Sequence, residues 1–344
     1  MGKEAYKLAG VDIDKGNQAV TRIREMAKQM GVGEIGKFSG FFPIPKLDAF
    51  EDPVLVSSAD GVGTKLKLAF MMDRHDTIGE DIVNHCVDDI LVYGSRPLFF
   101  LDYIAMGVLN PDTVGPIVSG MMKACVENEM LLLGGETAEM PGFYTPGEYD
   151  VAGFIVGLLD RSRALDGRGM QKGDVLLGLP STGLHTNGYS LARHIVFSQL
   201  GMSPQDTPEG WSESIGEALL RPHRSYLKPI RALQETSWLK GCAHITGGGF
   251  LENIPRILPD GLGVRISQTW PVPALFDFLV EKGEVSFMER HRVFNMGIGM
   301  VLVVDRQGIG EVTALLDSLK EPHFLMGEVV PQQEGAERVH ILSN

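Results

Sequence analysis

The strongest structural pattern of the sequence lies in residues 79–93, GEDIVNHCVDDILVY. Apolar pairs recur every four residues here, at Ile82/Val83, Cys86/Val87 and Ile90/Leu91, which is the spacing of an α-helix with one apolar side. The opposite side carries a continuous polar arc, which we call the acidic stripe; it consists of Glu80, Asp81, Asn84, His85, Asp88 and Asp89. The stretch therefore predicts a helix with carboxylates along one face.

The acidic stripe contains no Lys or Arg. A solvated helix face normally includes basic residues, because like charges four residues apart repel by about 0.2–0.5 kcal/mol. Carboxylate and amide oxygens are the ligands that Mg²⁺ prefers, and this ion commonly bridges carboxylates to substrate phosphates. The stripe alone leaves two interpretations open, a magnesium site or an acidic surface that aids solubility.

Upstream of this helix, a glycine-rich run follows a predicted strand over Val54–Ser57. Its sequence is Asp60-Gly61-Val62-Gly63-Thr64-Lys65, in which glycines let backbone N–H groups approach phosphate oxygens and Lys65 adds a positive charge. The spacing matches neither the P-loop nor the dinucleotide-binding motif. A plain turn remains an alternative for the run alone. Beside the acidic stripe, it predicts a Mg–nucleotide site to which Asp60 contributes a metal ligand.

Further elements extend in both directions from this region. The pattern predicts helices over 17–30 and 114–125 and strands over 97–109, 130–140 and 151–159. The polar segment 160–174 has little periodicity, so we place a domain boundary there, with an N-terminal domain over 1–170 and a C-terminal domain over 171–344. A strand, a glycine turn and a helix from about Gly188 follow. Helices and strands alternate irregularly, which indicates the α+β class.

Three more glycine turns carry polar residues. The first, Gly134-Gly135-Glu136-Thr137, ends a predicted strand, and the third, His244–Gly249, includes Gly247, Gly248 and Gly249. The second, Gly183–Gly188, contains His185 just before a predicted helix. A histidine at such a place can contact an anion or transfer a proton, although an exposed loop histidine and plain tight turns are the alternatives.

Composition excludes some classes of function. The formal net charge is −13 and no basic stripe is present, which argues against nucleic-acid binding. The three cysteines show no CxxC spacing and lie among apolar residues, so reduced thiols packed in a core are expected. The apolar stretch 152–159 is too short to span a bilayer, and the polar N-terminus does not resemble a signal peptide. We therefore expect a cytoplasmic protein without nucleic-acid or membrane partners.

Taken together, these motifs resemble the family of phosphoribosylformylglycinamidine cyclo-ligases, also called aminoimidazole ribonucleotide synthetases. The similarity rests on the runs SSADGVGTKLKLA, HDTIGEDIVNHCVDDI, PLFFLDYIA, LLGGETAEMPGFY, DVAGF, STGLHTNGYSLAR, HITGGGF and FNMGIGMVLVV, in this order from about Tyr6 to Val330. DGVGTK alone resembles only the wider superfamily of ATP-binding synthetases. Lys37 and Ser39 stand where the family often has glycine, and Asp88 stands where Asn is frequent.

The resemblance implies a two-domain subunit and a homodimer whose N-terminal strands build a shared barrel, with the C-terminal domain completing the active site. It also implies conversion of formylglycinamidine ribonucleotide and ATP to 5-aminoimidazole ribonucleotide, ADP and phosphate. Combined with the chemistry above, it assigns Asp60, Glu80, Asn84 and Asp89 to Mg²⁺ and Gly61, Gly63, Thr64 and Lys65 to the ATP phosphates. Asp60, Lys65 and His185 are the candidate catalytic residues. Gly135, Glu136, Thr137 and Gly247–Gly249 are candidate contacts for substrate or nucleotide.

Two other interpretations remain. A related enzyme, such as a selenophosphate synthetase or a thiamine-monophosphate kinase, would use similar motifs. The former usually carries a reactive Cys near its N-terminal glycine loop, whereas the first cysteine here is Cys86. A non-catalytic nucleotide-binding scaffold is the second alternative, against which the acidic stripe and the glycine turns argue.

Overall fold

The computed structural model describes residues 12–29, 40–333 and 335–342, and these form two compact units. The first unit comprises residues up to Ile90 and Arg96–Asp160, and the second comprises Leu91–Ser95 and Arg161–Asn344. The chain thus passes from one unit to the other at the start of the predicted boundary segment 160–174. The glycine-rich positions 36–39, including Lys37 and Ser39, lie outside the described residues.

The first unit is built on a mixed sheet of four strands in the order β1-β4-β2-β3. β1 (Pro53–Gly61) and β2 (Arg96–Met106) are both antiparallel to β4 (Tyr149–Asp160), and β2 is parallel to β3 (Leu131–Glu139). β1 is longer than the predicted strand because it pairs with β4 along its whole length, as far as Gly61 opposite Ala152. Asp60 is therefore held in a strand, and the turn begins only after Gly61.

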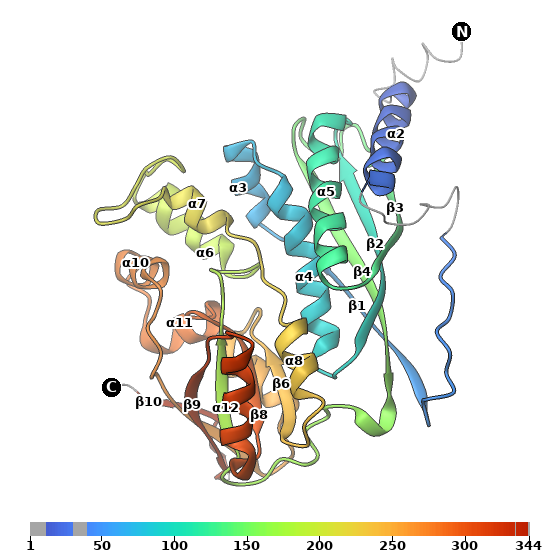
Figure 1. The fold of residues 1–344 in the computed structure, drawn as a ribbon. Helices are drawn as coiled ribbons and strands as arrows, with labels where there is room; N and C mark the ends of the chain where they lie inside the picture. The colour runs from blue at the N-terminus through green and yellow to red at the C-terminus, as the bar shows by residue number, and fades with distance from the viewer. Residues whose placement is uncertain (1–11, 30–39, 334, 343–344) are drawn as a thin grey trace. The chain divides into compact units, whose positions relative to one another are not determined.

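In the described part of this unit the helices are α2 (Ile13–Gln29), α3 (Lys65–Met72), α4 (Asp76–Leu91) and α5 (Pro111–Glu127) (Figure 1). α4 and α5 cross at Gly79 and Gly120, where a Cβ on either glycine would overlap backbone atoms of the other helix. The two glycines thus allow the close approach of the helices, and their small size is required by packing. The apolar pairs of α4 are buried as the four-residue period predicts.

The second unit contains a mixed six-stranded sheet in the order β10-β7-β9-β5-β8-β6. Its strands are β5 (Val175–Pro180), β6 (Leu239–His244), β7 (Leu262–Ser267), β8 (Ile298–Val304), β9 (Phe324–Pro331) and β10 (Val339–Leu342). Every residue of β8 is buried, so this strand lies in the centre of the core. Such a continuous apolar run is expected for a strand covered on both faces.

Short helices connect these strands, and α12 packs against α8 (Figure 1). The helical segments are η1 (Arg161–Arg163), α6 (Tyr189–Arg193), the π-helix η2 (His194–Gln199), α7 (Ile215–Leu220), α8 (Leu227–Leu233), α9 (Gly249–Asn253), η3 (Ile254–Ile257), α10 (Ala274–Lys282), α11 (Phe287–Val293), η4 (Arg306–Gly308) and α12 (Ile309–Ser318). Both units thus combine helices with a mixed sheet, as the α+β prediction requires at this coarse level.

One smaller expectation is also met. The three cysteines are free and buried, as predicted for core residues. No helix in the part of the chain that the structure describes is both long enough and apolar enough to cross a membrane.

Candidate functional site

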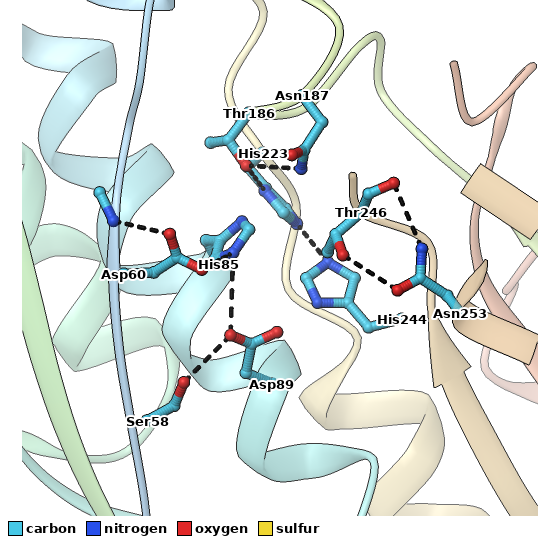
Figure 2. Close-up of polar contacts among 11 residues, drawn as sticks. Ser58, Asp60, His85, Asp89, Thr186, Asn187, His223, His244, Thr246 and Asn253 are labelled. Carbon is cyan, nitrogen blue, oxygen red and sulfur yellow. Dashed lines mark hydrogen bonds and ion pairs between the residues drawn. The ribbon is translucent and has the colours of Figure 1, made fainter. Parts of the chain in front are cut away.

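Two carboxylates of the first unit converge at the end of β1. Asp60 on β1 and Asp89 on α4 flank His85, whose Nε2 lies 2.6 Å from Asp60 Oδ2 and 3.7 Å from Asp89 Oδ2. The hydroxyl of Ser58 donates a hydrogen bond of 3.1 Å to Asp89 Oδ2. Figure 2 shows these side chains directed toward one another from the strand and the helix. We call Asp60, His85 and Asp89 the carboxylate–histidine site.

The charges of this site stabilise one another. Burial raises the pKa of Asp60, but the hydrogen bond and the charge of His85 outweigh it and hold the pKa below its ordinary value. Burial lowers the pKa of His85, but the hydrogen bond to Asp60 and the charge of Asp89 raise that pKa above its ordinary value. The site is therefore negative overall, with an imidazole that orients one of its two carboxylates.

The donor set fits a hard divalent cation. One ligand atom from each of the three residues lies within 4.8 Å of the others. On an octahedral Mg²⁺ with oxygen ligands at 2.0–2.1 Å, neighbouring oxygens are about 2.9 Å apart and opposite ones about 4.2 Å apart. The two carboxylates can thus hold one ion with small side-chain movements. Imidazole is a poorer ligand for this ion, so His85 suits the role of holding Asp60 in place.

The structure does not bring Glu80 and Asn84 to the same place as Asp89. The carboxylate of Glu80 pairs with Lys123 on α5 at 2.9 Å, and Asn84 Oδ1 accepts a hydrogen bond of 2.8 Å from Asn128. The reason is helical geometry: nine residues separate Glu80 from Asp89, which is two and a half turns at about 100° per residue. The two ends of the acidic stripe therefore face opposite sides, one toward α5 and the other toward β1.

The middle of the stripe is buried and not a solvated surface. Asp81 pairs with Lys65 at 2.8 Å, and both side chains are 0% exposed. Burial lowers the pKa of the Lys65 ammonium, and the charge of Asp81 opposes this effect only in part. The sequence interpretation placed this ammonium on ATP phosphates, whereas the structure places it in an internal ion pair between α3 and α4. Lys65 therefore has a structural role as the partner of Asp81.

The glycine run itself remains open to a ligand. Gly63 has a φ of +65°, and nothing lies within 4 Å of the place where its Cβ would be. Thr64 is the N-cap of α3, so the backbone amides of the run lead into the positive end of that helix. The predicted phosphate contacts Gly61, Gly63 and Thr64 lie directly after Asp60, but the Gly61 N–H donates a hydrogen bond of 2.7 Å to Asp60 Oδ1 and is not directed at a phosphate.

The Gly135–Thr137 segment is strand, and its residues point to alternate faces of the sheet. Gly135 pairs with Asp102 on β2, and a Cβ on Gly135 would overlap the Asp102 carboxylate. Burial raises the pKa of Asp102 to about 7. Glu136 pairs with Tyr103 and so lies on the opposite face from Gly135 and Thr137. The three residues therefore cannot all contact one ligand on a single face of this sheet.

In the second unit, His185 is buried and not an exposed loop histidine. Its φ is +64°, and its Nε2 accepts a hydrogen bond of 3.2 Å from the backbone N–H of Thr182. In the neutral ring the proton therefore resides on Nδ1. The ring stacks on His223 with centroids 3.9 Å apart. Proton transfer by His185, as predicted, would require this hydrogen bond to break if it took place at Nε2.

Two buried asparagines hold the glycine turns of this unit, and the sequence interpretation missed both. Asn253 donates to the carbonyls of Thr246, Gly247 and Gly249 at 3.3, 3.2 and 2.8 Å. Asn295 donates to the Gly183 carbonyl at 2.9 Å and accepts from the Ser181 hydroxyl at 3.0 Å. Asn253 follows the run HITGGGF, and Asn295 lies within the run FNMGIGMVLVV. An amide side chain beside a glycine-rich run could therefore have been predicted to bond its backbone.

Comparison with known proteins agrees with this architecture. A model of the family described as AIR synthase related protein, N-terminal domain, matches residues 47–159, and the model of the C-terminal domain of such proteins matches residues 171–340. These two domains, with carboxylates converging beside a glycine run, define an AIR synthase related protein.

The chain is 52% identical over 338 residues to the phosphoribosylformylglycinamidine cyclo-ligase of Geobacillus thermodenitrificans, covering 97% of this chain and 96% of that protein. It is also 52% identical to the enzyme of the same name from Desulfitobacterium hafniense, covering 96% and 98%. The chain belongs to the phosphoribosylformylglycinamidine cyclo-ligase family.

Solved structures share the fold at low identity. Thiamine-monophosphate kinase from Stenotrophomonas maltophilia K279a aligns with a TM-score of 0.67 and 16% identity, over 94% of this chain and 95% of that one. The hydrogenase maturation protein HypE of E. coli aligns with a TM-score of 0.65 and 18% identity, over 93% and 92%. A HypE structure in complex with ATP aligns with a TM-score of 0.65 and 16% identity, over 92% and 88%.

Proposed function

We propose that this protein closes the imidazole ring of 5-aminoimidazole ribonucleotide from formylglycinamidine ribonucleotide, consuming ATP and releasing ADP and phosphate in de novo purine biosynthesis. The observation that carries this proposal is 52% identity to a named cyclo-ligase over 97% of the chain. The reaction takes place in the cytoplasm, since buried free thiols such as the three here persist in a reducing compartment.

The carboxylate–histidine site holds Mg²⁺, and the adjacent glycine run binds the ATP phosphates. The ATP complex of HypE supports nucleotide use by this fold at the level of analogy. Asp60 and Asp89 supply the metal oxygens, while His85 donates from Nε2 to Asp60 Oδ2 and fixes the direction of that carboxylate. Backbone amides of Gly63 and Thr64 donate to phosphate oxygens at the start of α3, whereas the Gly61 N–H donates to Asp60 Oδ1 at 2.7 Å and helps to hold that carboxylate.

The chemistry needs activation, because an amide oxygen is a poor leaving group. Transfer of the γ-phosphoryl group to the formyl oxygen converts this oxygen into the leaving group phosphate, and the amidine nitrogen then attacks the formyl carbon. Bound Mg²⁺ would neutralise charge on the transferred phosphoryl group. The protein's own contribution is positioning and hydrogen bonding, and no covalent enzyme intermediate is required.

Residues of the glycine turns contact the nucleotide substrate in this proposal. Asn295 and Asn253 hold the turns that contain His185 and Gly247–Gly249, so their backbone groups are fixed before a ligand arrives. Gly135 and Thr137 lie on the sheet face that also carries Asp60, whereas Glu136 lies on the other face. Glu136 would therefore act on the sheet face opposite the one that carries Asp60, Gly135 and Thr137.

The protein functions as a homodimer in which the outer face of the four-stranded sheet meets a second copy. Leu55 on β1 is 70% exposed and Phe154 on β4 is 44% exposed, and both lie on the sheet face opposite Asp60. Large exposed apolar side chains on one face are typical of an interface. This supports the shared barrel that the family resemblance implies. Sedimentation of Phe154→Glu tests it, because loss of the dimer is expected.

Turnover assays distinguish this function from its alternatives. Purified protein with ATP, Mg²⁺ and formylglycinamidine ribonucleotide should release ADP only with substrate present and form an aminoimidazole. A phosphorylated open-chain product would indicate a kinase, as in the thiamine-monophosphate kinase that shares the fold. Nucleotide binding without turnover would indicate a scaffold. Either of these results would refute the proposed reaction.

A further inference from the structure

The second unit contains a buried pair of histidines that the proposed reaction does not use. His223 lies in the connection between α7 and α8, and His244 is the last residue of β6. Their Nε2 atoms are 3.2 Å apart, and both side chains are buried. Figure 2 shows the two rings meeting through these atoms. Two buried ring nitrogens of this unit thus meet at one point.

The contact requires that the two nitrogens differ in protonation. One Nε2 must carry the proton and the other must offer its lone pair. His223 Nδ1 lies 3.5 Å from the hydroxyl oxygen of Thr186, which can accept a hydrogen bond from an N–H at this nitrogen. Such a contact favours the tautomer of His223 with its lone pair at Nε2, so His244 donates. Metal-binding histidines commonly have an oxygen acceptor of this kind on the second ring nitrogen.

The distance between the two nitrogens also suits a metal ion. Zinc binds imidazole nitrogens at about 2.0–2.1 Å, and two such bonds to atoms 3.2 Å apart enclose an angle of about 100°. A tetrahedral ion requires an angle of about 109°. The separation of the two nitrogens therefore already suits two ligands of one ion, and the rings need to turn by up to about 40° so that each lone pair points at the ion instead of along the line between the nitrogens.

We propose that His223 and His244 form a binding site for a borderline-soft divalent cation, with Zn²⁺ as the best fit and solvent as the remaining ligands. Binding moves the shared proton from His244 Nε2 to the Nδ1 atom of the same ring, so both Nε2 lone pairs become available. No oxidant or reductant takes part. Imidazole nitrogens suit Zn²⁺, whereas Mg²⁺ prefers oxygen, so the pair and the carboxylate–histidine site select different ions.

The bound ion would join two turns of the proposed substrate site. His223 contacts Thr186 in the turn that contains His185, and His244 begins the turn that ends at Gly249. Slowed turnover at micromolar Zn²⁺ is the expected consequence, and this consequence rests on the proposed function. The binding itself does not, so binding is the quantity to measure.

The experiment is a calorimetric titration of Zn²⁺ into the full-length protein without ATP or substrate. Asp89→Asn serves as background, because the carboxylate–histidine site can also take up zinc. In this background we expect about one equivalent of Zn²⁺ to bind. Adding His223→Gln or His244→Gln should weaken the affinity for Zn²⁺ at least tenfold. His340→Gln, which removes an exposed histidine on β10, is the matched control and should bind as the background does.

Co²⁺ in place of Zn²⁺ gives a second measurement on the unsubstituted histidine pair. The visible absorption of four-coordinate Co²⁺ should appear in Asp89→Asn. Because this variant keeps both histidines, the result does not depend on whether the glutamine variants fold. Circular dichroism checks that those variants fold. Absence of Zn²⁺ uptake by Asp89→Asn, or equal uptake with His223 replaced in a folded protein, would overturn the proposal.

Discussion

The buried pair between Lys65 and Asp81 allows a sharp test of how the first unit is assembled. Both side chains are 0% exposed and their charged atoms are 2.8 Å apart. Removing one partner of such a pair leaves an uncompensated charge in the interior and costs about 3–5 kcal/mol. Lys65→Met should therefore lower the free energy of unfolding of the first unit by this amount, a large share of the 5–15 kcal/mol typical of a domain.

Lys67→Met provides the matched control. Lys67 lies on the same helix and pairs with Glu148 at 2.6 Å, but both side chains are partly exposed, so its loss should cost at most about 1 kcal/mol. Urea unfolding followed by circular dichroism measures both variants. Replacing Lys65 and Asp81 together by Met and Leu should cost clearly less than the sum of the single changes. A Lys65→Met variant that is as stable as Lys67→Met but binds ATP more weakly would show instead that the ammonium is a phosphate ligand.

Three further predictions follow from the site and the core. Asp89→Asn should reduce kcat at least tenfold, which corresponds to about 1.4 kcal/mol in the activation barrier, whereas Glu80→Gln should keep kcat within threefold of wild type. Steady-state assays measure both variants. Equal losses of kcat would contradict the conclusion that Asp89 faces the site and Glu80 faces α5. Asn253→Asp should destabilise the second unit by about 1–3 kcal/mol, because a carboxylate would replace the donor to three carbonyls; an unchanged urea midpoint would disprove this. Burial lowers the pKa of His291 to about 4, so the unfolded state binds the extra proton below pH 6.5, and stability is lost as the pH falls. Between pH 7.5 and 5, wild type should lose about 2 kcal/mol more than His291→Gln, and parallel urea curves would exclude the effect.

The helix of the acidic stripe shows how far sequence periodicity carries. Apolar pairs every four residues predicted a helix over 79–93, and α4 occupies Asp76–Leu91. The end differs because Leu91–Ser95 packs with the second unit, where the Tyr93 carbonyl accepts from the Leu165 N–H. Periodicity also predicted which residues form the polar arc. An arc that spans half the circumference of the helix, however, faces several neighbouring elements. Which residues meet β1 and which meet α5 depends on tertiary packing.

Other errors have different causes. The burial of Lys65 could not be read from its motif, because its partner Asp81 is sixteen residues further along the chain. The split of Gly135–Thr137 could have been predicted, since alternation in a strand places Glu136 opposite its neighbours. His85 was recognised within the stripe, but its contact with Asp60 needed the register of β1 against α4. Local patterns thus singled out these residues as candidates, and long-range packing decided their partners.

In the proposed site, Asp60 and Asp89 bind a nucleotide through Mg²⁺. Calorimetric titration of a non-hydrolysable ATP analogue, with Mg²⁺ and with a chelator, tests it most directly. We expect binding at least tenfold tighter with Mg²⁺, and loss of this difference in Asp60→Asn but not in Glu80→Gln. Equal affinity with and without the ion in the wild-type protein would contradict it.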